Sequence, residues 1–158
     1  MKINYSLYQE EIVKIRRKLH MHPETAFNEF KTTAFIKDYL ENIGYDVKSV
    51  EPTGCTALLE KDKSLPYIVV RAEMDAVPID EKTNLSFASK EKGAMHACGH
   101  DANMAAGFVA CLRWSLLPLL SVPPGLGRIG HYIFLHGHED TSRSPCRESP
   151  RCVITSWT

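Results

Sequence analysis

A short run of β-branched residues that ends in two acids constrains the fold of this chain more than any other feature. The run YIVVR occupies positions 67–71 and continues as AEMDAVP to Pro78. A run of this length and composition is typical of a buried strand. In open α/β sheets, ligands bind outside the carboxyl ends of the strands, which is where Glu73 and Asp75 would lie. The run therefore predicts an α/β fold with a ligand-binding site at the carboxyl end of this strand.

The motif MHACGHD at positions 95–101 brings a thiol and an imidazole within two residues of each other. Cysteine sulfur and histidine nitrogen are ligands that zinc and similar divalent metals prefer. Side chains two residues apart do not share one face of a helix, so Cys98 and His100 require a turn or an extended backbone. Gly99 supplies the conformational freedom for such a turn. The spacing therefore suits a metal site with Cys98 and His100 as ligands, although a C-x-H motif by itself is a weak indication.

Helical periodicity flanks these motifs on both sides. Residues 6–20 form an amphipathic pattern with Ser6 as the candidate N-cap and with inward positions Ile12, Ile15 and Leu19. A second pattern starts near Asn28, ends with Gly44 as its C-cap, and has inward positions Phe30, Ala34, Leu40 and Ile43. A third helix is expected from Asp101, with inward positions Met104, Phe108, Cys111 and Leu112. Short strands are expected near 46–50 and 56–60, before a turn at 61–66.

The composition is that of a soluble globular protein. The chain has 158 residues, 44% of them hydrophobic, and a formal net charge of zero, which favours neither nucleic acid nor an anionic membrane as a partner. The first residues lack the apolar core of a signal peptide, and Arg113 and Pro118 interrupt the apolar run at 112–122. Five cysteines without a dense, even framework favour reduced thiols. A cytoplasmic protein is expected.

A third block, RRKLHMHPE at positions 16–24, precedes the other two. The order R-R-x-L-H-x-H-P-E, R-A-E-M-D-A-V-P and M-H-A-C-G-H-D resembles the M20 family of metallopeptidases. Within that family it is most similar to the branch of aminoacylases, hippurate hydrolases and N-acetyldiaminopimelate deacetylases, in which a cysteine replaces a histidine ligand. The resemblance covers residues 11–112 and implies the N-terminal part of a zinc-peptidase-like catalytic domain, a mixed sheet flanked by helices.

The resemblance also implies a chemistry. An intact family member holds two divalent metal ions per site, and zinc, manganese, nickel and cobalt all remain open. The expected substrate is a small N-acyl amino acid or a related molecule, and intact relatives are expected to be homo-oligomers. Cys98 and His100 fall on metal ligands, and Asp75 falls on an aspartate that orients a ligand. Glu139 is the candidate general base. An ungapped match puts His138 and Glu139 on the family's paired glutamates, and a shift of one residue uses Glu139 and Asp140.

Other polar residues of the blocks have local interpretations. Asp101 is expected to be the N-cap of the third helix, which is compatible with an outer role at the metal site. His96 is expected to be structural rather than a ligand. Arg71 is expected to pair with one of the acids that follow it. The segment 20–23 is expected to be a turn in which Pro23 stops the first helix.

Beyond residue 112 the chain changes character. All eleven lysines lie at or before Lys92, whereas five of the eight arginines lie from Arg113 onward, and prolines are frequent there. We therefore expect an M20-type part at 1–112 and a divergent, poorly ordered tail at 113–158, as in a truncated or frame-disrupted hydrolase. Catalytic zinc sites have about three protein ligands, and the blocks supply Cys98 and His100. The alternative to an amidohydrolase is therefore a non-catalytic fragment that retains part of the fold.

Overall fold

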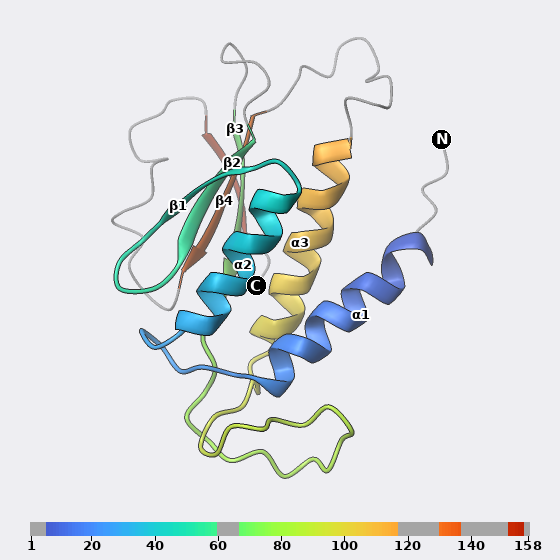
Figure 1. Ribbon diagram of the computed structural model, residues 1–158, viewed down its shortest axis with the longest axis vertical. Coiled ribbons are helices and arrows are strands. Elements are labelled where there is room, and N and C mark those ends of the chain that lie inside the picture. The colour runs from blue at the N-terminus through green and yellow to red at the C-terminus, as the bar shows by residue number, and fades with distance from the viewer. Residues whose placement is uncertain (1–5, 60–66, 117–129, 137–151, 157–158) are drawn as a thin grey trace.

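The structure, a computed structural model, describes residues 6–59, 67–116, 130–136 and 152–156. These residues form a five-stranded sheet and three helices (Figure 1). The helices are α1 (Ser6–Met21), α2 (Phe30–Asn42) and α3 (His100–Leu116), and the strands are β1 (Asp46–Ser49), β2 (Cys55–Leu59), β3 (Tyr67–Glu73), β4 (Gly130–His136) and β5 (Cys152–Ser156). The predicted α/β class is confirmed.

The sheet is mixed, with the strand order β1-β2-β4-β3-β5. The pairs β1–β2 and β2–β4 are antiparallel, and β3 pairs in parallel with both β4 and β5. The strand predicted at 67–71 is therefore internal, and it extends two residues further, to Glu73. Because it is hydrogen-bonded on both edges, its carboxyl end has a fixed place in the molecule.

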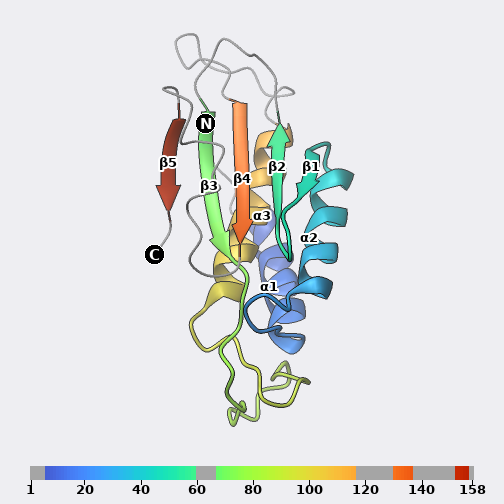
Figure 2. The same cartoon turned by 90° about the vertical axis from the view of Figure 1, so that its left-hand side faces the viewer.

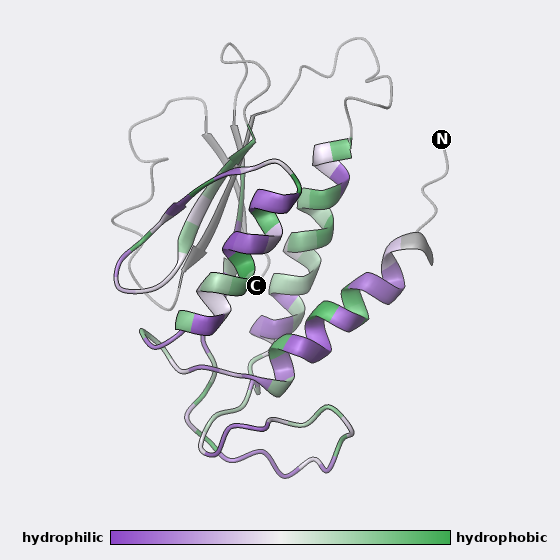
Figure 3. Ribbon diagram, in the orientation of Figure 1, coloured by the Kyte–Doolittle hydropathy of each residue, from purple (hydrophilic) through white to green (hydrophobic). Residues whose placement is uncertain are grey.

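All three helices lie on the same face of the sheet (Figure 2), and α3 lies between α1 and α2 (Figure 1). The hydropathy of the helices follows this arrangement, since α3 is mostly apolar and α1 carries long polar stretches (Figure 3). Ile15 and Leu19 of α1 are buried as predicted, and Met104, Phe108 and Cys111 of α3 are buried with them in one core. The core also takes alternate residues of β2, Cys55, Ala57 and Leu59.

The second helix differs from its predicted orientation. Its buried residues are Thr32, Ile36 and Leu40, whereas Phe30 is 60% exposed and Ala34 is exposed. Ala34 precedes Ile36 by two residues, about 200° around a helix of 3.6 residues per turn, so both cannot face the core. Of the four predicted inward positions, Leu40 is buried and Ile43 is partly buried.

The end of α2 is the one predicted from Gly44. Its backbone has φ +91°, the left-handed region that glycine adopts without a steric penalty. The amide of Gly44 donates to the carbonyl of Glu41 at 3.0 Å, and the amide of Tyr45 donates to the carbonyl of Leu40 at 3.0 Å. These two bonds form a Schellman motif, which satisfies carbonyls that the helix leaves free.

Three segments of the tail predicted after residue 112 are among the described residues. Helix α3 continues to Leu116, and β4 and β5 are strands of the central sheet. β4, with the sequence GHYIFLH, is hydrogen-bonded to β2 along one edge and to β3 along the other. Residues 117–129 and 137–151 lie outside the described residues, and the boundary at 112 stays a prediction.

Two expectations drawn from composition concern thiols and membranes. Cys55 and Cys111 are buried free thiols, and Cys98 is an exposed free thiol. Within the described residues, no helix combines the length and apolar character needed to cross a bilayer.

The packing of the core predicts that a buried and an exposed phenylalanine contribute differently to the free energy of unfolding. Phe108 is 2% exposed and its ring lies 4.7 Å from the Tyr39 ring centroid, so Phe108→Ala should lower the free energy of unfolding by about 3–5 kcal/mol. Phe30→Ala, at an exposed position of α2, should change it by less than about 0.5 kcal/mol. Urea denaturation of both variants measures the difference, and equal effects would contradict the packing described here.

Candidate metal centre

The three sequence blocks meet at the carboxyl end of β3. Immediately after the strand, the amide of Ala76 donates to the carbonyl of Glu24 at 2.7 Å, which joins the end of β3 to the segment after α1. The next residue, Val77, pairs with Met95 through two backbone hydrogen bonds of 2.9 and 3.0 Å. The three blocks therefore converge just after the carboxyl end of β3, where the sequence predicted the site. Their residues are 16–24, 71–78 and 95–101.

His100, the first residue of α3, lies against the two acids that follow β3. Its Nδ1 donates to the backbone carbonyl of Asp75 at 2.9 Å and lies 3.1 Å from Asp75 Oδ1. Its Nε2 lies 3.1 Å from Glu73 Oε2. A carbonyl oxygen only accepts hydrogen bonds, so the contact assigns a hydrogen to Nδ1. In a neutral ring, Nε2 then carries the lone pair that binds a metal.

Glu73 also pairs with Arg71, whose Nη2 lies 2.9 Å from Glu73 Oε1. The predicted pairing of Arg71 with a neighbouring acid is therefore confirmed. Arg71 and Glu73 are two residues apart on one strand, so they lie on the same face of the sheet. The ion pair holds Glu73 beside the His100 ring, on the side from which a cation would approach Nε2.

The polar atoms around His100 fit a cation. Within the described part of the chain, Asp75 Oδ1 is buried and has no hydrogen-bond donor. A buried carboxylate oxygen without a donor is costly, and a metal ion satisfies it as a hydrogen bond would. The described residues nevertheless bring together no group of three or more histidine, cysteine or acidic side chains able to hold a metal ion.

The other predicted site residues differ in how the structure places them. Cys98 lies on the turn before α3, where Gly99 has φ +85°, and its thiol is exposed rather than packed among apolar side chains. Glu139, Asp140 and His138 lie outside the described residues. The structure thus joins His100 to Asp75 and Glu73 and leaves Cys98 accessible two residues away.

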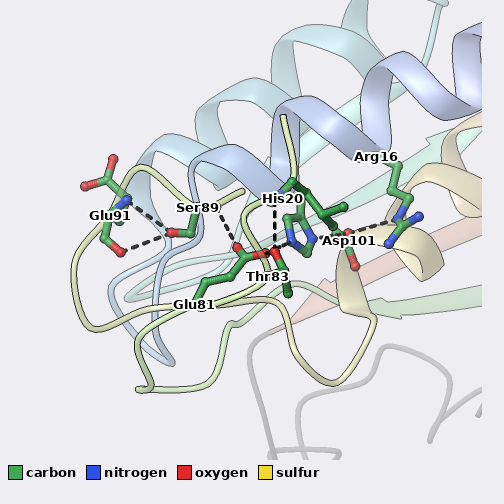
Figure 4. A network of polar contacts seen from close by, with 8 residues as sticks. Arg16, His20, Glu81, Thr83, Ser89, Glu91 and Asp101 are labelled. Atoms are coloured by element: carbon green, nitrogen blue, oxygen red, sulfur yellow. Dashed lines mark hydrogen bonds and ion pairs between the residues drawn. The ribbon is translucent and has the colours of Figure 1, made fainter. Parts of the chain in front are cut away.

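The prediction that Asp101 is an N-cap is wrong. Asp101 is the second residue of α3, is fully buried, and accepts hydrogen bonds from His20 Nδ1 at 2.8 Å and Arg16 Nε at 3.1 Å (Figure 4). The backbone of Gly99 closes the start of the helix instead, since its carbonyl accepts from the amides of Ala102 and Asn103. Two donors from α1 draw the carboxylate into the core, away from the free amides of its own helix.

His96 is buried at 3% exposure, in line with the structural role expected for it. Burial lowers the pKa of His96 to about 4, because desolvation disfavours the charged ring, and the nearby Asp101 carboxylate opposes this only partly. Neither ring nitrogen has a hydrogen-bond partner within the described residues. His96 is therefore a buried, neutral imidazole near neutral pH.

Two glutamates that the motifs did not single out as functional support the end of β3. The carboxylate of Glu24 accepts from the amides of Lys31 at 3.2 Å and Thr32 at 2.8 Å, so it caps α2 from a distance. Glu29 is fully buried and accepts from Thr53 Oγ1 at 2.5 Å. Burial raises the pKa of Glu29, and the charges of Asp75 and Glu24 raise it further against the hydrogen bond from Thr53. Glu24 and Glu29 are five residues apart in the sequence, and this spacing does not predict their contacts.

Comparison with known proteins agrees with this geometry. The family model described as peptidase family M20/M25/M40 matches residues 69–115. The chain is 46% identical over 105 residues to the N-acetyl-L-cysteine deacetylase of Bacillus subtilis, covering 66% of this chain and 25% of that protein. It is 40% identical over 103 residues to the hippurate hydrolase of Campylobacter jejuni, covering 65% of this chain and 27% of that protein. The chain spans about a quarter of the length of these curated relatives.

The solved structures lead to the same group. The YXEP protein of Bacillus subtilis, described as a dinuclear metal binding peptidase from the M20 family, has a TM-score of 0.70 and 34% identity. The match covers 82% of this chain and 35% of that one. A putative aminohydrolase from methicillin-resistant Staphylococcus aureus has a TM-score of 0.74 and 30% identity, with 89% and 38% of the chains covered.

The fold is a mixed α/β domain. Sequence similarity and fold then give the family: the chain belongs to the M20 peptidases and amidohydrolases, and its described residues correspond to the N-terminal portion of their catalytic domain. Members of this family are metal-dependent amidohydrolases and peptidases.

The buried Glu29 predicts a pH dependence of stability. A carboxyl whose pKa is raised on folding from its ordinary value of 4.5 stabilises the protein below that value and loses this contribution as pH rises through the folded pKa. Glu29→Gln keeps an acceptor for Thr53 and removes the ionisation. Between about pH 5 and pH 8, the wild type should therefore lose more stability in urea denaturation than Glu29→Gln does.

Glu10→Gln serves as the control, because Glu10 is exposed on α1 and its variant should follow the pH dependence of the wild type. Parallel pH profiles of the wild type and Glu29→Gln would show that Glu29 ionises freely in the folded protein.

Proposed function

We propose that this site belongs to a metal-dependent amidohydrolase that removes the acyl group from an N-acyl amino acid or a related small molecule. One observation carries the proposal: the backbone carbonyl of Asp75 accepts a hydrogen bond from His100 Nδ1, which leaves Nε2 as the metal-binding nitrogen at the carboxyl end of β3. An acceptor that fixes the tautomer in this way is the usual outer partner of a metal-binding histidine. The deacetylase and hippurate hydrolase activities of the relatives support the substrate class.

Each residue of the site has a distinct task in this proposal. His100 and Cys98 hold the metal ion, and zinc, manganese, nickel and cobalt all suit a site of nitrogen, sulfur and carboxylate ligands. Asp75 orients the His100 ring and stabilises positive charge beside it. Glu73 lies 3.1 Å from Nε2, so a metal that binds this nitrogen displaces the Glu73 contact or shares it.

The bound metal would polarise the amide carbonyl and activate water for attack. A carboxylate must then take the proton of that water and return it to the leaving amine. Glu139 is the proposed base, in either register with His138 or Asp140, and the family's second metal would need ligands beyond those described. His96 is buried and neutral, so it adds no positive charge near the metal.

A second candidate function is a non-catalytic member that keeps the fold. The observation that favours it is the incomplete set of ligands within residues 6–59 and 67–116. The two candidates differ in two properties: the non-catalytic fragment lacks enough ligands to hold a catalytic metal, and only the enzyme releases a free amino acid. A cytoplasmic location, and homo-oligomers among intact relatives, stay predictions for either one.

Metal binding is tested with cobalt, whose bond to a thiolate gives a strong near-ultraviolet absorption. The wild-type chain should show this band, Cys98→Ala should lose it, and His100→Ala should lower the affinity by more than the roughly 10–100-fold typical of changes outside the ligand set. The control is His22→Ala, because the His22 side chain is 45% exposed and its nearest acid, Glu91, is 3.7 Å away. A wild-type chain without the band would contradict the proposed ligands.

Activity is tested by release of free amino acid from N-acetylcysteine and from hippurate, with zinc or manganese added. Chelator-sensitive release that disappears in Cys98→Ala and His100→Ala supports the enzyme. Asp75→Asn should then lower turnover by about 10–100-fold, since it removes the carboxylate charge 3.1 Å from His100 Nδ1 and leaves the ligand and the backbone acceptor in place. Absence of release, with or without metal binding, supports the non-catalytic alternative.

A further inference from the structure

His20 occupies an unusual place between two acids from separate parts of the chain. It lies near the end of α1, and its side chain is 6% exposed. Its Nδ1 lies 2.8 Å from Asp101 Oδ2 in α3, and its Nε2 lies 3.3 Å from Glu81 Oε1 in the loop 78–94 (Figure 4). Both partners are carboxylate oxygens, so each accepts a hydrogen bond from a ring nitrogen that carries hydrogen. One imidazole thus links three segments.

The Asp101 end of this bridge holds the start of α3. Asp101 follows His100 directly, and its side chain is fully buried. Arg16, one turn before His20 on α1, donates to the same oxygen at 3.1 Å. Because Asp101 belongs to the first turn of α3, a shift of its carboxylate rotates that turn. The direction of His100 Nε2 therefore depends on the contact between His20 and Asp101.

The Glu81 end holds the loop. The carboxylate of Glu81 is 2% exposed and accepts from the amide of Ser89 at 2.6 Å and from the hydroxyl of Thr83, so it gathers residues 81–89 around itself. Phe87 of this loop packs edge-on against the His20 ring, with 5.6 Å between centroids. The Arg17 guanidinium lies 4.9 Å from the Phe87 centroid and covers its outer side.

The two ends of the bridge lie on either side of the turn that carries Cys98. The loop 78–94 leads into the Val77–Met95 pair, and three residues after Met95 comes Cys98. Asp101 lies three residues after Cys98. His20 therefore holds the backbone before this turn, through Glu81, and the backbone after it, through Asp101.

We propose that His20 is a positioning residue of the metal centre, which couples the loop 78–94 to the first turn of α3 and so sets the distance between the Cys98 thiol and His100 Nε2. The proposal rests on the proposed metal-binding function of those two residues. It differs from a purely structural role for His20, in which the ring only stabilises the packing of α1 against α3.

Two substitutions separate the halves of the bridge. The amide nitrogen of asparagine reaches the position of histidine Nδ1, so His20→Asn keeps a donor for Asp101 and loses the one for Glu81. The amide nitrogen of glutamine reaches the position of Nε2, so His20→Gln keeps a donor for Glu81 and loses the one for Asp101. His20→Ala loses both. His22→Asn, two residues further on the exposed turn, is the matched control.

Two measurements on the 158-residue chain report separately on the two contacts of His20. Trypsin cleavage at Lys82, Lys90 and Lys92 reports on the loop, and cobalt affinity with its thiolate band reports on the metal turn. We expect His20→Asn to speed cleavage several-fold and keep metal affinity near that of the wild type. His20→Gln should keep the loop protected and lower metal affinity by about 10–100-fold, and His20→Ala should do both.

The outcomes distinguish this proposal from the proposed function. If the wild type binds no metal, the proposed function fails, and the coupling is judged by trypsin cleavage and by hydrogen exchange at the amides of Ala102 and Asn103. If the wild type binds metal, opposite patterns in His20→Asn and His20→Gln support the coupling. Equal patterns in these two variants, wild-type behaviour of His20→Ala, or loss of folding in both amide variants would overturn it.

Discussion

The enclosure of β3 is the constraint on which the rest of the structure depends. Both edges of this strand are hydrogen-bonded, to β4 and to β5, while Val70 and Ala72 pack in the core beneath the helices. A strand enclosed in this way cannot slip by one residue, because a slip would turn its apolar side chains to the opposite face. The register therefore gives Glu73 and Asp75 fixed places, and the candidate metal centre is assembled around them.

The same end of the sheet concentrates polar groups that burial penalises. Glu29 and Asp101 are fully buried and His96 is 3% exposed. Within the described residues, each has at least one polar atom without a partner, which costs about 1–3 kcal/mol where no other group satisfies it. A fold tolerates such costs where function requires them, so their clustering at this edge agrees with the site that the three blocks indicate. The apolar core elsewhere carries the stability.

The site is also a meeting point of segments that are remote in the sequence. The end of α1 supplies His20, the segment before α2 supplies Glu24 and Glu29, and the turn before α3 supplies Cys98. Each segment is anchored to the backbone just after β3 or to the first turn of α3. This arrangement agrees with the M20 relatives of the chain, which include deacetylases and a dinuclear metal binding peptidase.

The sequence by itself determined the α/β class, the internal strand predicted at 67–71, the three helices and the edge at which the candidate site lies. These features follow from local spacing: the β-branched run, the helical stripes of α1 and α3, and the left-handed Gly44 each act within a few residues. Local spacing also explains why the outward position of Phe30 was missed, since its helix offered two apolar stripes and only packing against the sheet chose between them.

Only the tertiary structure decided how the polar residues pair and where the later strands lie. His20 and Asp101 are 81 residues apart, so no spacing rule connects them, and the same carboxylate had an equally good local role as an N-cap. The insertion of β4 between β2 and β3, antiparallel to the first and parallel to the second, likewise depends on pairing with residues more than sixty positions away. Local patterns specify which element a segment forms, and long-range burial decides which of the competing hydrogen-bond partners each polar group takes.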